Sequence, residues 1–385
     1  MQKIIKGNKG EWSELFVLVS LIAEGKMHQA DINLNIDPNN TYDVISAYKN
    51  ESNYILEFSR SNVITILKIE KSNRSTIATF TQTEFRNVSK KLYNGIKLGK
   101  GNSFEISELY TFLNKSLITK LKADASLKAD LKLKIYDHRI ARETDLGFSV
   151  KSLLGGNSTL YNTGPGNNFI YTSKSNINES VSEFNKRTYK SPINKESKIT
   201  YRLKELAKAG VNFKFKAVQS DQFSQNLKMV DGDMAEILAW GLFYRWKDNY
   251  PTFKQVADCL ESNDPMNYYK GKPSVQRIYE YKIKRFLTEA AMGMTSEKVW
   301  LGEYDSFGGV IIAKEDGGIV CFHIYDFNLF REYLLNNTTL EQASTGEDEN
   351  NPGNPKATGK KYHYSWLYQE NEEIAIKLNL QVRFM

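Results

Sequence analysis

The stretch LKLKIYDHRIARETDLGFSVKSLL, residues 131–154, decides the fold. In its first six positions apolar residues alternate with lysine and tyrosine, which is the period of a strand with one buried face. Asp137 follows in phase with the apolar positions. A polar turn over 139–145 then leads to a second alternating segment over 147–154. The stretch therefore predicts a β-hairpin with an aspartate in line with its buried face.

On the second strand, Ser149 and Lys151 share one face, because successive side chains of a strand point to opposite sides. If that face coincides with the face of Asp137, the three side chains converge at one end of the hairpin. An unpaired buried charge is costly, so such a group is either paired or bound to a cation. The pattern favours metal-dependent phosphodiester hydrolysis, in which Asp137 holds Mg²⁺. Ser149 would then hold a metal-bound water, and Lys151 would lie near the phosphate and orient the attacking water.

Each residue also has a plainer interpretation. Asp137 suits the start of a turn at a strand end, and Ser149 suits a solvent-facing strand position. Lys151 suits an edge strand that must avoid aggregation. The coincidence of the three within one hairpin is what favours the functional interpretation.

A second carboxylate is expected from the helix predicted over 9–24. Its apolar residues recur at helical spacing, and Gly25 ends it. Glu14 lies one helical turn before Leu18, on the apolar stripe and not on a solvated face, which makes it a candidate metal ligand. Favourable charge at a helix N-terminus is the alternative.

The rest of the chain alternates between helices and strands. The expected elements are strands within 53–69 and over 76–80, helices over 84–94 and 103–122, strands over 169–171 and 211–218 on either side of a helix over 198–209, helices within 231–296, strands within 298–334, and a docked final strand over 374–384. The order around the hairpin is thus helix, insertion, three strands, helix, strand.

Composition sets the outer limits. The 385 residues include 52 Lys and Arg against 45 Asp and Glu, a net charge of +7 that permits a polyanionic partner without proving one. Two cysteines and four scattered histidines exclude a disulfide framework and a zinc site of closely spaced Cys and His ligands. The longest apolar run, 15–23, is too short for a bilayer span. These features predict a soluble, cytoplasmic protein.

DNA contacts are expected from polar loops and basic stretches, although each such residue is more often part of a solvated surface. One loop follows Lys151, a second basic stretch lies near Tyr268, and a long loop spans 344–361. The candidates are Asn157, Ser158, Thr159, Asn162, Asn168, Lys272, Arg277, Lys360, Lys361 and His363.

With these motifs the sequence resembles the PD-(D/E)XK nuclease fold and, more closely, the HpaII-type restriction endonucleases. The segments that carry the resemblance are NKGEWSELFVLVSLIAEGK (8–26), LGFSVKSLLGGNSTLYNTGPGNNFIY (146–171), VWLGEYDSFGGVIIAKEDGGIVCFHIYD (299–326) and KLNLQVRF (377–384). They span nearly the whole chain, and the first two are fairly specific.

The resemblance implies an α/β fold with a PD-(D/E)XK-like core, a mixed central sheet flanked by helices. It implies a nuclease core over 1–220 and a helical and β region over 221–385 that serves DNA recognition or dimerisation. It also implies a Mg²⁺-dependent type II endonuclease that acts as a homodimer on double-stranded DNA, at a short palindromic site containing G and C. Asp137 matches the metal-binding Asp of the fold, and Glu14 looks like the helix-borne Glu of archaeal Holliday-junction resolvases.

Two positions depart from the pattern of the fold. Ser149 stands where most members carry an acid, and Tyr136 stands where proline usually precedes the aspartate. MspI- and HinP1I-like restriction enzymes are similar in placing an uncharged polar residue at the first of these positions. The serine nevertheless motivates an alternative function, a DNA-binding or recombination accessory protein with a degenerate nuclease core.

Overall fold

The computed structural model describes residues 4–71, 73–121, 129–156, 159–175, 177–189, 196–272, 274–303, 308–341 and 364–385. The chain forms two compact units. Unit 1 comprises residues 1–158 and 304–333, and unit 2 comprises 159–303 and 334–385. The chain passes into unit 2 after residue 158, returns to unit 1 at 304 and passes into unit 2 again at 334. None of these three boundaries coincides with the predicted division at residue 220.

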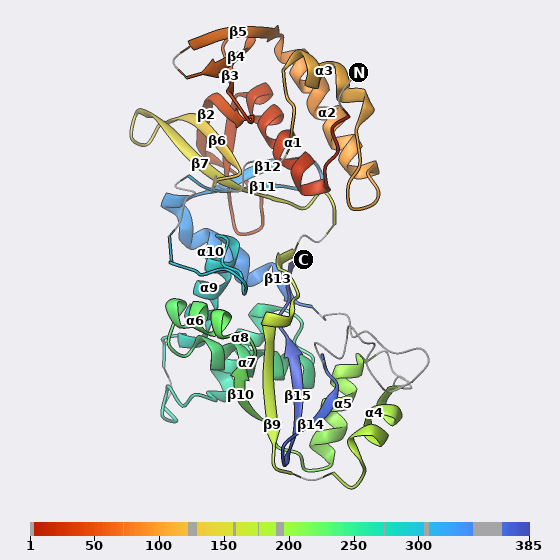
Figure 1. The fold of residues 1–385 in the computed structure, drawn as a ribbon. Coiled ribbons are helices and arrows are strands. Elements are labelled where there is room, and N and C mark those ends of the chain that lie inside the picture. Colours follow the sequence, from red (N-terminus) through yellow and green to blue (C-terminus); the bar gives the residue numbers. More distant parts are fainter. Residues whose placement is uncertain are drawn as a thin grey trace. The chain divides into compact units, whose positions relative to one another are not determined.

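A single large sheet organises unit 1 (Figure 1). Its order among the described residues is β1-β12-β11-β7-β6-β2-β3-β4-β5. Because β1 also pairs with β2, the strands from β1 to β2 in this order close into a barrel, and β3 to β5 extend from it as a meander. The strands are β1 Lys26–Ala30, β2 Ile36–Asn50, β3 Ile55–Arg60, β4 Ile64–Glu70, β5 Asn73–Phe80, β6 Leu131–Asp137, β7 Arg142–Ser152, β11 Gly309–Ala313 and β12 Ile319–His323.

Helix α1 (Lys9–Glu24) fills the core of unit 1, as its apolar stripe predicts. Asn8 and Glu11 form a capping box at its start, and Gly25 ends it in the left-handed region at φ 73°. Its buried face packs against apolar side chains of the sheet, among them Leu133 and Phe148. The helix lies against β7, the second strand of the decisive hairpin, and against β2.

Other helical segments of unit 1 confirm one prediction and contradict another. The helix predicted over 84–94 is present as the longer α2 (Gln82–Leu98), beside α1. The helix predicted over 103–122 is wrong in extent: the described part holds a 3₁₀ turn, η1 (Ser107–Leu109), and the short α3 (Tyr110–Lys115). Leu117 at φ 53° breaks the helical path there.

Unit 2 contains two smaller antiparallel sheets, ordered β10-β9-β15-β14 and β13-β16-β8, with helices beside them. The strands are β8 Thr159–Tyr161, β9 Asn168–Ser173, β10 Lys214–Val218, β13 Thr338–Leu340, β14 Leu367–Glu370, β15 Glu373–Asn379 and β16 Val382–Phe384. The helices are α4 Val181–Tyr189, α5 Lys198–Lys208, α6 Asp221–Val230, α7 Met234–Lys247, α8 Phe253–Asn263 and α9 Ile278–Ala291, and α10 Phe327–Asn336 crosses the boundary between the units. The C-terminal segment is docked as predicted, since β15 lies between β9 and β14.

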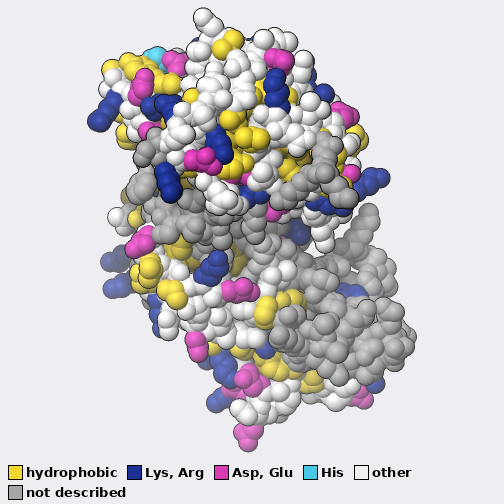
Figure 2. Space-filling view, turned by 45° about the horizontal axis from the view of Figure 1, so that its top comes forward, with side chains coloured by type: hydrophobic (Ala, Val, Ile, Leu, Met, Phe, Trp, Pro, Cys, Tyr) yellow, Lys and Arg dark blue, Asp and Glu magenta, His cyan; other side chains and the backbone are white. Residues whose placement is uncertain are grey.

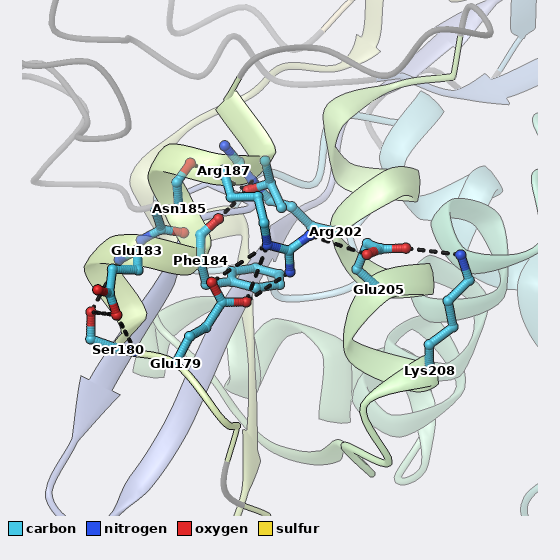
Figure 3. A network of polar contacts seen from close by, with 10 residues as sticks. Glu179, Ser180, Glu183, Phe184, Asn185, Arg187, Arg202, Glu205 and Lys208 are labelled. Carbon is cyan, nitrogen blue, oxygen red and sulfur yellow. Dashed lines mark hydrogen bonds and ion pairs between the residues drawn. The ribbon is translucent and has the colours of Figure 1, made fainter.

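Helices α4 and α5 are joined by a polar network (Figure 3). Arg187 of α4 pairs with Glu179 and with Glu205 of α5. Arg202 of α5 is fully buried and donates to Thr188 and Ser365. These contacts join the two helices beside the sheet of unit 2.

The strands expected to complete the hairpin's sheet lie elsewhere. The segments 169–171 and 211–218 were predicted to follow the hairpin within one core, but β9 and β10 pair with each other in unit 2. The hairpin is continued instead by β11, whose five buried residues run parallel to β7. The predicted strand order is therefore wrong, although the mixed α/β class is confirmed.

Candidate active site

Strand register decides which carboxylate meets Ser149. Leu131 pairs with Phe148, and Asp137 pairs with Arg142 at the turn end of the hairpin. Ser149 therefore lies across from Asp130, the residue just before β6. The Asp130 Oδ2 atom accepts hydrogen bonds from Ser149 Oγ at 3.0 Å and from the backbone nitrogen of Val150 at 2.8 Å. Asp130 and not Asp137 is the aspartate at this end of the hairpin.

The predicted convergence of Asp137 with Ser149 and Lys151 is wrong. The length of β6, about 20 Å at roughly 3.3 Å per residue, separates Asp137 from Ser149. The two also point to opposite faces, because the register places Asp137 on the side of Phe148. The physical reason is the length of the turn. It spans only residues 138–141 and β7 begins at Arg142, whereas the predicted turn ran to residue 145, so the register of the two strands differs from the predicted one.

The Asp137 side chain is held by a local cluster of hydrogen bonds and ion pairs. It is 2% exposed, and its Oδ1 accepts from the backbone nitrogen of Arg139 at 2.9 Å and from Arg139 Nε at 3.3 Å. Arg139 also pairs with Asp326 at 3.1 Å, and its guanidinium lies over the rings of Tyr42 and Tyr325. The cluster ties the hairpin turn to the 3₁₀ turn η3 (Ile324–Asp326).

His323 lies within the same cluster. It is 1% exposed, stacks on Tyr42 with ring centroids 4.9 Å apart, and contacts the tilted ring of Tyr325 at 4.7 Å. Burial, and then the positive charge of Arg139, lower the pKa of His323 to about 4. The folded protein thus keeps this imidazole neutral at pH values where the unfolded chain protonates it.

We expect a loss of stability in mild acid that depends on His323. A folded-state pKa below the unfolded value of about 6.5 leaves stability intact above pH 6.5 and removes it as the pH falls towards 4. Between pH 7 and pH 5 the unfolding free energy should fall by about 2 kcal/mol more in the natural protein than in His323→Phe, which keeps an aromatic ring. Urea unfolding at the two pH values measures this, and equal losses in both proteins would contradict it.

Glu14 reaches the Asp130 end of the hairpin from α1. Burial, followed by the negative charge of Asp130, raises the pKa of Glu14 to about 8, while Lys49 and Lys151 act against this rise. Among the described residues, its carboxylate has no hydrogen-bond donor and no ion-pair partner. The charge of Asp130 thus acts on Glu14, and Lys49 and Lys151 offset it only in part.

The N-terminal part of α1 is anchored directly to the end of β7. Ser13 Oγ and Ser152 Oγ are 2.8 Å apart. Gly155 allows the close approach of Lys9, since a Cβ at Gly155 would lie 2.7 Å from Lys9 Cδ. These contacts hold Glu14 near the strand that carries Lys151.

Sequence reasoning missed Asp130 and Lys49. Asp130 had a usable signal, because it immediately precedes the alternating strand and faces Ser149 once the turn is placed at residue 138. Lys49 on β2 had no usable signal in the sequence, because its strand was not recognised. Its side chain is buried, lies 3.7 Å from Glu51 Oε1 and donates to the Leu121 carbonyl at 3.3 Å. Burial lowers the pKa of Lys49.

The donor set fits a hard divalent cation. Asp130 and Glu14 supply carboxylate oxygens, and Ser149 supplies a hydroxyl. Among the described residues no three or more His, Cys, Asp and Glu side chains gather as a metal site. A centre with two carboxylates suits Mg²⁺, which keeps several water ligands and needs few protein ones. Burial, and then the charge of Asp130, raise the pKa of Glu14, and a bound cation would offset both effects.

The predicted DNA contacts have different outcomes. Asn157, Ser158, Lys360, Lys361 and His363 lie outside the described residues. Thr159, Asn162 and Lys272 lie in unit 2, partly or fully exposed.

For Asn168 the prediction of a direct contact is wrong, because the side chain is fully buried. Its amide donates to Gln219 Oε1 at 2.9 Å and accepts from Asn379 at 2.8 Å. Arg277 is exposed but pairs with Asp258 and Glu280, so its charge is compensated within the chain. On the face drawn in Figure 2, the coloured Lys and Arg side chains are interspersed with Asp and Glu.

Within the part of the chain that the structure describes, no helix has the length and apolar character needed to cross a membrane. No solved structure matches the chain significantly. The type II restriction enzyme HpaII of Haemophilus parainfluenzae is 32% identical to this chain in an alignment of 391 positions, which covers the full length of both proteins. Residues 8–384 match the model of the family described as HpaII restriction endonuclease. The chain therefore belongs to the HpaII restriction endonuclease family and is a type II restriction endonuclease.

Proposed function

We propose that the chain hydrolyses double-stranded DNA with Mg²⁺ at a centre formed by Glu14, Asp130, Ser149 and Lys151. The observation that carries this proposal is the pair of hydrogen bonds from Ser149 and the backbone of Val150 to the Asp130 carboxylate. They join a carboxylate on one strand to the serine-x-lysine motif on the next.

We further propose that α1, β6, β7 and β11 form a PD-(D/E)XK-like core. Support comes from a helix-borne glutamate, an antiparallel hairpin with the motif on its second strand, and a buried parallel strand beside that strand. Ser149 replaces the acid of the motif, and Glu14 supplies the missing carboxylate from α1.

Each residue has a distinct role in this proposal. Asp130 and Glu14 would hold Mg²⁺, which when bound polarises the phosphate and offsets the charge that develops on it. Ser149 and the Val150 nitrogen fix the orientation of the Asp130 carboxylate. The ammonium group of Lys151 attracts the phosphate and orients the attacking water. Glu14 must lose its proton to serve, since its pKa without a cation is about 8.

We also propose a homodimer acting on a short palindromic site that contains G and C. The described residues provide one such centre in each chain, so a concerted cut of both strands needs two copies. A twofold dimer matches the symmetry of a palindrome. Residues 221–385 would serve DNA recognition or dimerisation. Thr159, Asn162 and Lys272, which all belong to unit 2, would contact the DNA.

The family match argues against the alternative predicted from the sequence, a DNA-binding or recombination accessory protein with a degenerate nuclease core. That alternative rests on the serine at position 149, whose hydroxyl cannot replace the charge of a carboxylate; in the proposed centre Glu14 supplies that charge.

A plasmid assay separates the two functions. We expect discrete fragments with Mg²⁺ and intact plasmid with EDTA. Lys151→Ala should abolish cleavage while leaving the gel shift. The matched variant Lys132→Ala removes an exposed lysine from the adjacent strand and should cleave within about threefold of the natural rate. A gel shift with no cutting in Mg²⁺ would support the accessory protein instead.

A further inference from the structure

We infer that unit 1 contains a pocket for a small amphipathic anion, distinct from the candidate active site. The pocket has a volume of about 650 Å³ and lies between α1, α2, β1 and the turn that joins β11 to β12. Phe16, Ser20 and Glu24 line it at intervals of four residues along α1. Glu14 precedes Phe16 by two residues, so it projects from the opposite side of the helix.

The interior is largely apolar and has a small polar floor. Leu21, Ile36 and Ile319 contribute aliphatic walls. At the floor, Ser20 Oγ and Ser89 Oγ lie 2.6 Å apart and satisfy each other across α1 and α2. Pockets of roughly 300–1,000 Å³ with apolar walls and few polar groups are the usual sites for small organic ligands.

Tyr93 gives this pocket a preformed aromatic wall. Its hydroxyl donates to the carbonyl of Glu315 at 3.0 Å. The β11–β12 turn closes on the ring, since a Cβ at Gly317 would lie 3.0 Å from its carbon atoms, and Gly317 itself is at φ 86°. The ring is thus held in place from two sides, so a ligand would stack on it at little cost in side-chain ordering.

Charge at the rim selects an anion. Two carboxylates line the pocket and both are engaged: Glu24 pairs with Arg86 at 3.1 Å, and Asp316 pairs with Lys314 at 3.3 Å. Lys26 and Lys90 also line it, and neither has a carboxylate partner among the described residues. The uncompensated charge at the rim is therefore positive.

The volume of the pocket, its apolar walls and the positive charge at its rim together define the class of ligand. It has an aromatic or aliphatic body of one to three rings that fills the apolar interior. It carries one phosphate, carboxylate or sulfonate group that reaches Lys26 and Lys90. No residue of the proposed catalytic centre lines this pocket, so the inference stands whether or not that centre is correct.

Anilinonaphthalene sulfonate, an aromatic sulfonate, is a suitable probe for the full-length native protein. Fluorescence titration should show saturable binding of one probe per chain. The uncharged analogue phenylnaphthylamine should bind at least about tenfold more weakly, because it leaves the two lysines unpaired.

Neighbouring lysines of α2 provide the matched variants. Lys90→Glu should weaken probe binding by about tenfold or more, and Lys90→Ala by a smaller factor in the same direction. Lys91→Glu makes the same charge change at an exposed position that does not line the pocket and should change binding less than twofold. Circular dichroism checks that each variant is folded. Non-saturable binding, equal binding of the neutral analogue, or equal effects at positions 90 and 91 would each overturn the inference.

Discussion

Asp130→Asn is expected to slow Mg²⁺-dependent cleavage by roughly 10²–10³-fold or more. The substitution keeps the size of the side chain but removes the charge that would bind the cation. The hydrogen bonds from Ser149 and the Val150 backbone keep an oxygen acceptor, so the local fold should survive. Single-turnover cleavage of a plasmid at saturating protein isolates this chemical step.

Asp137→Asn is the matched control at the other end of the same strand. Asp137 receives charge-assisted hydrogen bonds from Arg139, and weakening them should cost about 1.5–3 kcal/mol of folding free energy. Cleavage by the folded fraction should stay within a fewfold of the natural rate. If the folded Asp137→Asn protein does not cleave DNA while the Asp130→Asn protein does, the catalytic centre lies at Asp137 and not at Asp130.

Glu14→Gln is expected to stabilise the metal-free protein while abolishing cleavage. The pKa of Glu14 is raised to about 8 in the folded state, against 4.5 for the ordinary side chain. Its contribution to stability is therefore fully present below pH 4.5 and is lost as the pH rises towards 8. Glutamine has no charge to lose, so at pH 8 the variant should be more stable by on the order of 2 kcal/mol, allowing for partial exposure of the site.

Urea unfolding in EDTA at pH 5 and pH 8 measures this effect, and the advantage of Glu14→Gln should be small at pH 5. Added Mg²⁺ should stabilise the natural protein and not the variant. Glu11→Gln is a useful comparison, because Glu11 accepts from the backbone of Asn8 in the capping box. It should lower stability modestly at both pH values. A destabilised Glu14→Gln protein at pH 8 would rule out the proposed crowding of carboxylates.

Local sequence patterns predicted the positions of helices and strands better than they predicted which strands pair with each other. Helix α1 followed from its apolar stripe and Gly25, and β6 from its alternation, because both are set by neighbouring residues. The docked C-terminal strand followed from its apolar sequence. The partners of β9 and β10 did not, because pairing between distant segments leaves no periodic trace in the sequence.

For the same reason, only part of the candidate site could be predicted from the sequence. Ser149 and Lys151 were found because their spacing is local. The aspartate was misassigned because an error in the position of a turn shifts the register of a hairpin and exchanges its faces. Lys49 was missed because its strand was not predicted. Residues 36–50 are rich in Asn and Asp near their start, and they form a strand through pairing with β1 that closes the barrel.

The central claim is that a divalent cation binds between Asp130 and Glu14. A crystal of the natural protein soaked in Mn²⁺, which substitutes for Mg²⁺ at oxygen-rich sites, tests it directly through the anomalous signal of the metal. We predict a peak within about 2–2.6 Å of a carboxylate oxygen of Asp130, with Glu14 turned towards it. A peak at Asp137, or a fully occupied site that neither Asp130 nor Glu14 touches, would contradict the account.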